Sequence, residues 1–240
     1  MAINNVFKNS AGYTLGNLLL KAFSFFLIPL YTTYLSSEEY GIFNLATGFA
    51  TLLSSIVSLG LQYAVVRFYA EYRNNREKLA VLFSSILMII VICSILVGSL
   101  TYYYQKEISQ YFFNQIKFFP IIFLTLLLSI LTALYTIYQN ILKGMGRASE
   151  SILLSYFYFA IIFISNIVAL SIFKQGVLGV LYSLSLSNLL AVIYMFISLV
   201  KSRLITYKFN LPIIRELLLY SMPLLPHSLA FNFQLYITKI

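Results

Sequence analysis

Seven apolar segments, separated by short polar links, follow one another along the chain. Each is long enough to cross the hydrocarbon core of a bilayer as a helix, which takes about 20 residues. The segments cover residues 12–34, 42–66, 79–103, 118–142, 152–173, 177–200 and 217–240. The links between them are too short to fold as soluble domains. The pattern therefore predicts an all-α integral membrane protein with about seven transmembrane helices.

The first segment places its polar residues on one face of a helix. Within one arc of about 80° lie Ser10, Thr14, Asn17, Lys21, Ser24 and Thr32. A cation inside an apolar run, such as Lys21, costs roughly 2.5–3.5 kcal/mol on insertion scales. Either a hydrated cavity solvates this charge, or the long side chain extends to the nearer membrane interface. The segment alone leaves both interpretations open.

Comparable polar faces recur further along the chain. In the second segment the face comprises Asn44, Thr47, Thr51, Ser54, Ser58 and Gln62. In the fourth segment it comprises Thr125, Ser129, Thr132, Thr136, Gln139 and Lys143. The seventh segment, which Pro223 and Pro226 disturb, has a shorter set: Ser221, Ser228, Asn232 and Lys239. Ser and Thr also join helices in membranes, but three complete faces, two of them with a lysine, favour a shared hydrated cavity. The third, fifth and sixth segments show scattered Ser and Gly and no such face.

The composition is that of a membrane protein and offers little for catalysis. The 240 residues are 60% hydrophobic and 10% charged, whereas soluble domains carry about 25% charged residues. The single cysteine, Cys93, lies in the middle of an apolar segment, so the sequence has neither a disulfide pair nor zinc-ligand spacing. All seven acidic residues are Glu, and none lies deep in a segment. We therefore expect no metal, no cofactor and no catalytic residues.

The net charge of +9 reflects membrane topology rather than nucleic-acid binding. The cations lie mainly in the links, and Lys and Arg are enriched in the cytoplasmic links of membrane proteins. With the N-terminus inside, eleven of them fall on the cytoplasmic side and three, Lys106, Lys117 and Lys174, on the outer side. The predicted orientation therefore has a cytoplasmic N-terminus. We expect the first segment to act as an uncleaved insertion signal, because residues 1–10 have no apolar core.

Three runs of sequence carry motifs of a known family. Residues 28–72 read IPLYTTYLSSEEYGIFNLATGFATLLSSIVSLGLQYAVVRFYAEY, and the family pairs IPLYTxxLSxxxYG with LGLxxAxxRFYxEY. The run LKGMGRASESILLS resembles the family's link between the fourth and fifth spans, and MPLLPHSLAFNFQLYITKI resembles its seventh span. That span commonly reads PLxPHxL followed by an SDR-like triplet. Here the triplet positions hold Ile237, Thr238 and Lys239, so the base is kept as Lys and the acid is missing.

These runs resemble bacterial polysaccharide flippases of the Wzx type. The resemblance implies a fold like that of the multidrug and toxic-compound extrusion (MATE) transporters, in which two lobes of six helices face a central cavity. Residues 1–216 are then expected to form the N-terminal six-helix lobe, and residues 217–240 the first helix of a truncated second lobe. On this view the chain is a fragment, and the missing C-terminal lobe is one of its partners.

The resemblance also implies a function. The substrate is expected to be an undecaprenyl-pyrophosphate-linked oligosaccharide, translocated across the bacterial cytoplasmic membrane by alternating access. A hydrated, cationic cavity suits its diphosphate and its sugars. The candidate substrate-binding residues are Asn17, Lys21, Asn44, Gln62, Thr132, Gln139 and Lys239. Membrane lipid, a polysaccharide polymerase and glycosyltransferases are the other implied partners, and nucleic acid is not one.

Other functions stay open at this stage. A MATE-like cation or drug antiporter typically uses an intramembrane carboxylate, whereas the first segment has Lys21 and the chain has no Asp. A membrane-embedded glycan-modifying enzyme needs acid and base groups at the boundary of water and lipid. The lone histidine, His227, has no acidic neighbour on its helix face. A half-protein that assembles with a separate second half is also compatible with the sequence.

Overall fold

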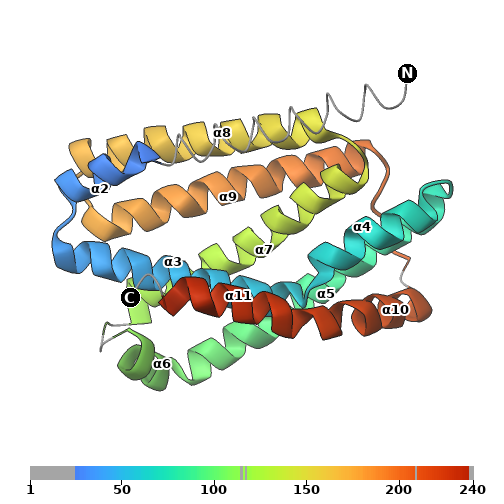
Figure 1. Cartoon of the computed structure of the whole chain (residues 1–240), viewed down its shortest axis with the longest axis horizontal. Coiled ribbons are helices and arrows are strands. Elements are labelled where there is room, and N and C mark those ends of the chain that lie inside the picture. Colours follow the sequence, from blue (N-terminus) through green and yellow to red (C-terminus); the bar gives the residue numbers. More distant parts are fainter. Residues whose placement is uncertain (1–24, 114–115, 117, 209, 238–240) are drawn as a thin grey trace.

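The structure, a computed structural model, describes residues 25–113, 116, 118–208 and 210–237. These residues form helices and turns, and no strand occurs among them. The elements are α2 (Leu27–Tyr34), α3 (Ser37–Ser58), α4 (Leu61–Tyr72), α5 (Arg76–Tyr103), α6 (Gln105–Phe112), η1 (Phe118–Ile122), α7 (Phe123–Gly144), α8 (Ala148–Ile167), η2 (Val168–Ile172), α9 (Gly176–Lys201), α10 (Leu211–Ser221), η3 (Met222–Leu224) and α11 (Leu225–Ile237). In Figure 1, α8 and α9 run side by side, as do α3 and α11.

Five predicted segments contain helices long and apolar enough to cross a membrane. These are Ser37–Ser58, Arg76–Tyr103, Phe118–Gly144, Ala148–Ile172 and Gly176–Lys201. The seventh segment forms α10, η3 and α11 in succession. Of the first segment, α2 is described, and the part before Phe25 lies outside the described residues. The prediction of an all-α, multi-pass membrane protein is thus confirmed, and the arrangement fits about seven spans.

The second segment is longer than predicted, and it is broken. It begins at Ser37 because a capping box precedes it: the Ser36 side chain accepts from the Glu39 N–H, and the Glu39 carboxylate accepts from the Ser36 N–H. The helix ends at Ser58, since Leu59 and Gly60 both have left-handed backbone, with φ of 48° and 73°. The prediction of one continuous helix over residues 42–66 is wrong, because a Leu–Gly pair inside an apolar run does not interrupt the hydropathy.

The seventh segment begins earlier than predicted and is also broken. Asn210 caps α10, because its Oδ1 atom accepts from the Ile213 N–H at 3.3 Å, and Pro212 occupies the first turn. The helix therefore starts at Leu211 rather than at residue 217. It is interrupted at η3, which contains Pro223, a residue that has no N–H to continue the helical bonding. The lobe boundary at residue 216 stays a prediction.

The breaks in the second and seventh segments lie against each other. A Cβ atom on Gly60 would be 2.8 Å from the carbonyl oxygen of Ser221. Glycine at this position provides both the left-handed backbone and the close approach. On one side of the breaks α11 packs on α3, where Asn232 Nδ2 donates to Ser55 Oγ at 2.6 Å. On the other side α10 packs on α4. The two segments therefore bend together at one level of the bundle.

Helix α7 holds the bundle together. It packs on α3, α4 and α9, and its fully buried side chains include Ile137, Tyr138 and Leu142. Because α7 is shared by these contacts, it fixes the positions of α3 and α9 on either side of it. Helix α8 then packs on α9 along its length (Figure 1). This arrangement positions the polar cleft described below.

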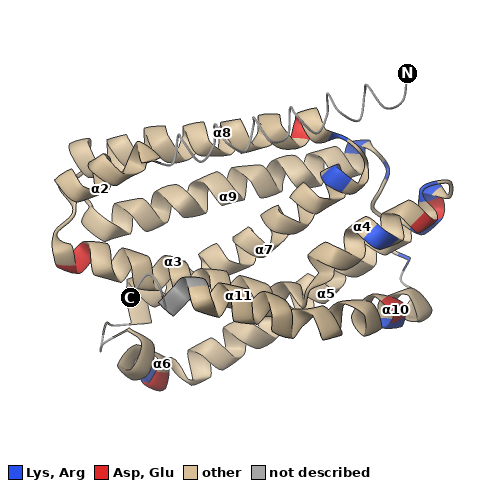
Figure 2. Ribbon diagram, viewed as in Figure 1, with Lys and Arg blue, Asp and Glu red and all other residues tan. Residues whose placement is uncertain are grey.

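Most of the described basic residues lie at one end of the bundle. Figure 2 shows them at the right, near the ends of α4, α7 and α9 and on α10. There the guanidinium of Arg67 lies 4.3 Å from the ring centroid of Tyr220, and Lys208 Nζ lies 2.9 Å from Glu77 Oε1. The hydrogen bond to Glu77 and the charge of that carboxylate raise the pKa of Lys208. At this end lie the links that the sequence predicts to be cytoplasmic.

Candidate functional site

A cleft of about 650 Å³ lies among α2, α3, α7, α8 and α9. This volume is within the range of about 300–1,000 Å³ that small-molecule sites have. Its polar lining includes Tyr31, Asn44, Thr47, Tyr135, Ser155 and Tyr158. The cleft is thus a mostly apolar hollow that contains a small group of polar side chains, which are costly in a membrane bundle unless they are bonded or serve a ligand.

Among the described residues, four tyrosines line the cleft, and a buried amide donates to the phenol oxygens of three of them, which come from three different helices. Asn166 Nδ2 donates to Tyr31 at 3.2 Å. Asn188 Nδ2 donates to Tyr158 at 2.9 Å. Gln139 Nε2 donates to Tyr135 at 2.9 Å. The bonds from Asn166 and Asn188 join α8 to α2 and α9 to α8, whereas the bond from Gln139 lies within α7, and together they fix the three phenol oxygens.

The amides lie behind the cleft wall and are nearly inaccessible. Asn166 is 0%, Asn188 1% and Gln139 8% exposed. Gln139 is held on its other side too, since Ser151 Oγ donates to its Oε1 atom and its Nε2 atom donates to Ser155 Oγ at 3.1 Å. A buried amide without partners costs several kcal/mol, in the range of about 2–7 kcal/mol. The tyrosines therefore accept from the amide nitrogens, and these bonds orient the tyrosines, whereas the Oδ1 atoms of Asn166 and Asn188 have no partner among the described residues.

The cleft has hydrogen-bonding groups for which no described residue is a partner. The phenol oxygens of Tyr31 and Tyr158 accept from amides, and no described residue accepts from their hydroxyl hydrogens. The side-chain amide of Asn44 makes no hydrogen bond to a described residue. Two hydroxyl donors and one amide are therefore available to a bound molecule.

The described residues that line the cleft carry no charge at neutral pH. Its walls are otherwise aromatic and aliphatic, and the rings of Tyr135 and Tyr158 stack at 4.6 Å with an interplanar angle of 14°. Within the described part of the chain, no three His, Cys or Glu side chains could hold a metal ion together. The described lining is suited to binding a neutral, hydroxyl-bearing molecule.

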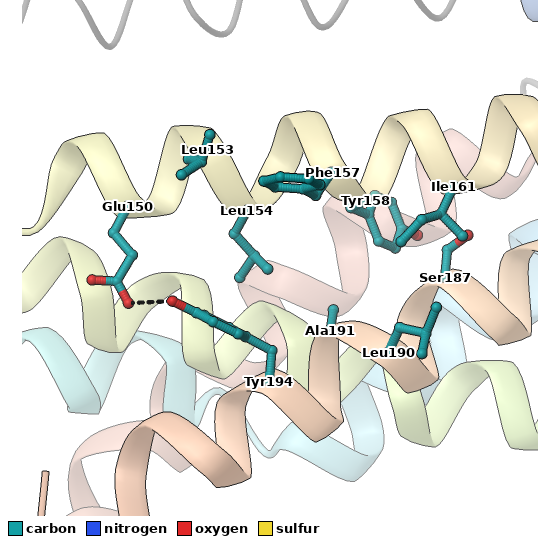
Figure 3. A pocket seen from close by; sticks show the side chains of 10 residues that line it. All are labelled: Glu150, Leu153, Leu154, Phe157, Tyr158, Ile161, Ser187, Leu190, Ala191 and Tyr194. Atoms are coloured by element: carbon teal, nitrogen blue, oxygen red, sulfur yellow. Dashed lines mark hydrogen bonds between the residues drawn. The ribbon is translucent and has the colours of Figure 1, made fainter. Parts of the chain in front are cut away.

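A second hollow, of about 280 Å³, lies between α8 and α9 (Figure 3). Its walls are mostly apolar, from Leu153, Phe157 and Leu190 among others. At one end Glu150 Oε1 accepts from the Tyr194 hydroxyl at 3.1 Å, drawn as a dashed line in Figure 3, and Glu150 Oε2 lies 2.5 Å from Arg147. The carboxylate is occupied by these contacts, so this groove offers a bound molecule little beyond apolar surface.

The family of the chain is shown by its sequence. The profile of a family described as "Polysaccharide biosynthesis protein" matches residues 6–240. The chain belongs to this family. The resemblance to Wzx-type flippases that the motifs predict is thereby confirmed. No curated protein matches the chain significantly.

A solved transporter shares the fold. The crystal structure described as "MATE in complex with MaD3S" matches with a TM-score of 0.53 and 16% sequence identity, over 94% of this chain and 52% of that one. The chain therefore spans about half the length of the solved transporter. At this identity the similarity shows the fold alone. The prediction of a MATE-like fold for this polysaccharide biosynthesis protein is confirmed.

The predicted binding residues are placed differently by the structure. Asn44 lines the cleft, and Gln139 lies behind its wall. Thr132 is half-buried on α7, and Gln62, at the start of α4, has a buried Oε1 atom without a partner among the described residues. Three further candidates, Asn17, Lys21 and Lys239, lie outside the described residues. The binding roles of all seven stay predictions.

The predicted polar faces of the second and fourth segments only partly face a cavity. Ser58, Thr125 and Ser129 are buried and donate to carbonyl oxygens of their own helices, three or four residues earlier. Helices α3 and α7, which carry them, pack against each other. For these residues the cavity interpretation is wrong, because small side chains that bond their own backbone let the helices approach closely. Asn44 and Thr47, near the start of α3, do line the cleft.

The tyrosines of the cleft and two of the amides, Asn166 and Asn188, lie outside the polar faces that the sequence predicts. Asn166 and Asn188 are the lone amides of the fifth and sixth segments, which show no regular polar face. A usable signal was present: an amide alone in an apolar segment needs a partner, and tyrosine combines an apolar ring with a polar tip. This signal indicates tyrosine as the type of partner, but the partner itself depends on which helices pack together.

Proposed function

We propose that the protein is a flippase that moves an undecaprenyl-pyrophosphate-linked oligosaccharide across the bacterial cytoplasmic membrane by alternating access. The observation that carries this proposal is the uncharged polar cleft within one half of a transporter fold, in a chain of the polysaccharide biosynthesis family. Family and fold support a transporter rather than an enzyme. The lipid chain stays in the bilayer while the polar headgroup crosses between the lobes.

The positions of the acidic residues support an oligosaccharide over a cation or drug. A cation-coupled antiporter is expected to use a carboxylate inside the membrane. Here Glu39, Glu77 and Glu150 lie in the first turns of their helices. None of the described residues that line the cleft is acidic. A cationic substrate would therefore find no counter-charge in the cleft.

We further propose that residues 1–216 form the first lobe and that residues 217–240 begin the second. The half-length match to the MATE-fold structure supports this division. We expect the second lobe to complete the central cavity, and we expect the binding candidates Lys21 and Lys239, which lie outside the described residues, to face it. A polysaccharide polymerase and glycosyltransferases are the proposed functional partners.

The function is tested by reconstitution of the full-length protein into vesicles that carry the lipid-linked oligosaccharide. Exposure of the oligosaccharide on the opposite leaflet is measured with a membrane-impermeant glycosidase. We expect protein-dependent exposure and no accumulation of ethidium in response to a proton or sodium gradient. Gradient-driven ethidium transport without oligosaccharide exposure would refute the flippase and favour the antiporter.

The proposed orientation places the N-terminus and the basic end of the bundle in the cytoplasm. It rests on the Lys and Arg distribution (Figure 2). In a Cys93→Ser background, we expect Ser37→Cys to react with an impermeant thiol reagent from outside intact cells, and Asn74→Cys to react only after permeabilisation. Both native side chains are exposed, and Asn74 is preferred to Asn75 because Asn75 caps α5. Labelling of Asn74→Cys in intact cells would contradict this orientation and indicate the inverted topology.

A further inference from the structure

We infer that the cleft among α2, α3, α7, α8 and α9 binds a neutral sugar ring of the transported oligosaccharide, with Tyr31, Tyr158 and Asn44 as its hydrogen-bonding residues. The inference rests on the proposed function and deepens it, because it assigns one part of the substrate to a site within a single lobe. The diphosphate binds elsewhere. Three properties of the cleft lead to this assignment: fixed donors, aromatic walls and the lack of charged side chains among its described lining residues.

The donors are held in place before a ligand arrives. Each phenol oxygen of Tyr31 and Tyr158 accepts from a buried amide, at 3.2 and 2.9 Å, so the hydroxyl hydrogen is left for an acceptor in the cleft. Positions fixed in advance reduce the entropy lost on binding. Sugar hydroxyl oxygens accept and donate hydrogen bonds, and the free amide of Asn44 can do both in return. The set matches a polyol in number and type.

The walls suit the shape of a sugar ring. A pyranose presents C–H groups on its faces and hydroxyl groups at its edge, so it packs on aromatic rings while it forms hydrogen bonds at the rim. The stacked pair of Tyr135 and Tyr158 and the pair of Tyr31 and Phe43, with centroids 4.9 Å apart, provide such rings. Tyrosine supplies the apolar face and the polar tip in one side chain.

The lack of charge among the described lining residues favours one part of the substrate over the other. A diphosphate in this cleft would be buried without a cation among the described lining residues, and an unpaired buried charge costs several kcal/mol or more. A protonated drug would be buried without a carboxylate. A neutral sugar incurs neither cost. The cleft therefore favours the uncharged part of the substrate over the diphosphate.

The test measures binding of the free repeat-unit oligosaccharide, released from its lipid by mild acid, to the full-length protein in nanodiscs. Saturation-transfer NMR titrations give the affinity. We expect Tyr31→Phe, Tyr158→Phe and Asn44→Leu each to weaken binding about three- to tenfold, the loss of one neutral hydrogen bond. The matched control is Tyr182→Phe, which removes a hydroxyl from an exposed side chain of α9 outside the cleft. It should bind normally, and inorganic pyrophosphate should not compete.

Unchanged affinity in the Tyr31→Phe/Tyr158→Phe variant, or displacement of the oligosaccharide by pyrophosphate, would overturn the assignment. If the tyrosine variants lose the fold, Asn44→Leu decides alone, because Asn44 makes no hydrogen bond to a described residue. The vesicle assay separates the two proposals. If the wild-type protein flips the lipid-linked substrate and the cleft variants bind the free oligosaccharide normally, only the sugar site is refuted. If the cleft variants bind the oligosaccharide more weakly but the wild-type protein flips no substrate, the flippase function is refuted and the sugar site is retained.

Discussion

Gly60→Ala is expected to lower the free energy of unfolding by roughly 2–4 kcal/mol. Two costs add at this buried position. The backbone has φ of 73°, which an L-residue adopts at a cost of about 1–2 kcal/mol. The new Cβ would also lie 2.8 Å from the Ser221 carbonyl oxygen, so the second and seventh segments would have to separate where they bend together. Unfolding is measured with a thiol-reactive dye, which reports exposure of the half-buried Cys93.

Substitutions at two other glycines distinguish the backbone cost from the cost of the contact with Ser221. Gly146 has φ of 70° and open space around a Cβ, so Gly146→Ala should show the backbone cost alone, about 1–2 kcal/mol. Gly41 lies within α3 with ordinary helical backbone and open space, so Gly41→Ala should be neutral or stabilising by up to about 1 kcal/mol. Equal losses for Gly60→Ala and Gly146→Ala would show that the contact with Ser221 has no energetic importance.

The hydropathy pattern predicts the spans well because membrane helices have few alternatives. With no water in the bilayer core, backbone groups must bond within the segment, so an apolar run of sufficient length becomes a helix. The predicted range 177–200 and the helix Gly176–Lys201 differ by one residue at each end. Prediction fails where the backbone changes direction inside an apolar run. The left-handed backbone of Leu59 and Gly60 divides one predicted helix into two, and the hydropathy of a residue does not depend on its φ angle.

The cleft was less predictable because its residues come from helices distant in sequence. The hydrogen bond from Asn166 to Tyr31 joins residues 135 positions apart, and no helical periodicity connects them. The search for polar faces gave weight to Ser and Thr, most of which bond their own backbone, as Thr51 does to Thr47. It gave none to tyrosine. The chemistry of the cleft thus depends on which helices pack together, and the sequence of each helix taken alone does not specify that.

Lys21→Ala and Lys21→Glu are expected to abolish export of the polysaccharide. The diphosphate needs a cation, and the described residues of the cleft supply none. Lys21 lies outside the described residues, and its role is predicted from the sequence: it shares a helix face with Thr14, Asn17 and Ser24. No acid lies three or four residues away to pair with it, since those positions hold Asn17, Leu18, Ser24 and Phe25. The sequence therefore predicts that the positive charge of Lys21 is available to the proposed substrate.

The variants are compared in the full-length protein, in a strain that lacks its own flippase. Surface polysaccharide and the amount of protein in the membrane are measured together. If the role of Lys21 is electrostatic, Lys21→Arg keeps much of the export, because the charge is retained. Lys21→Ala and Lys21→Glu remain at normal abundance without export, since a hydrated cavity wall accepts either change more readily than lipid does. If Lys21 only extends to the membrane interface, the opposite result is expected for Lys21→Ala, namely normal insertion and normal export. That result at normal abundance would remove Lys21 from the mechanism and leave the diphosphate to another cation, such as Lys239.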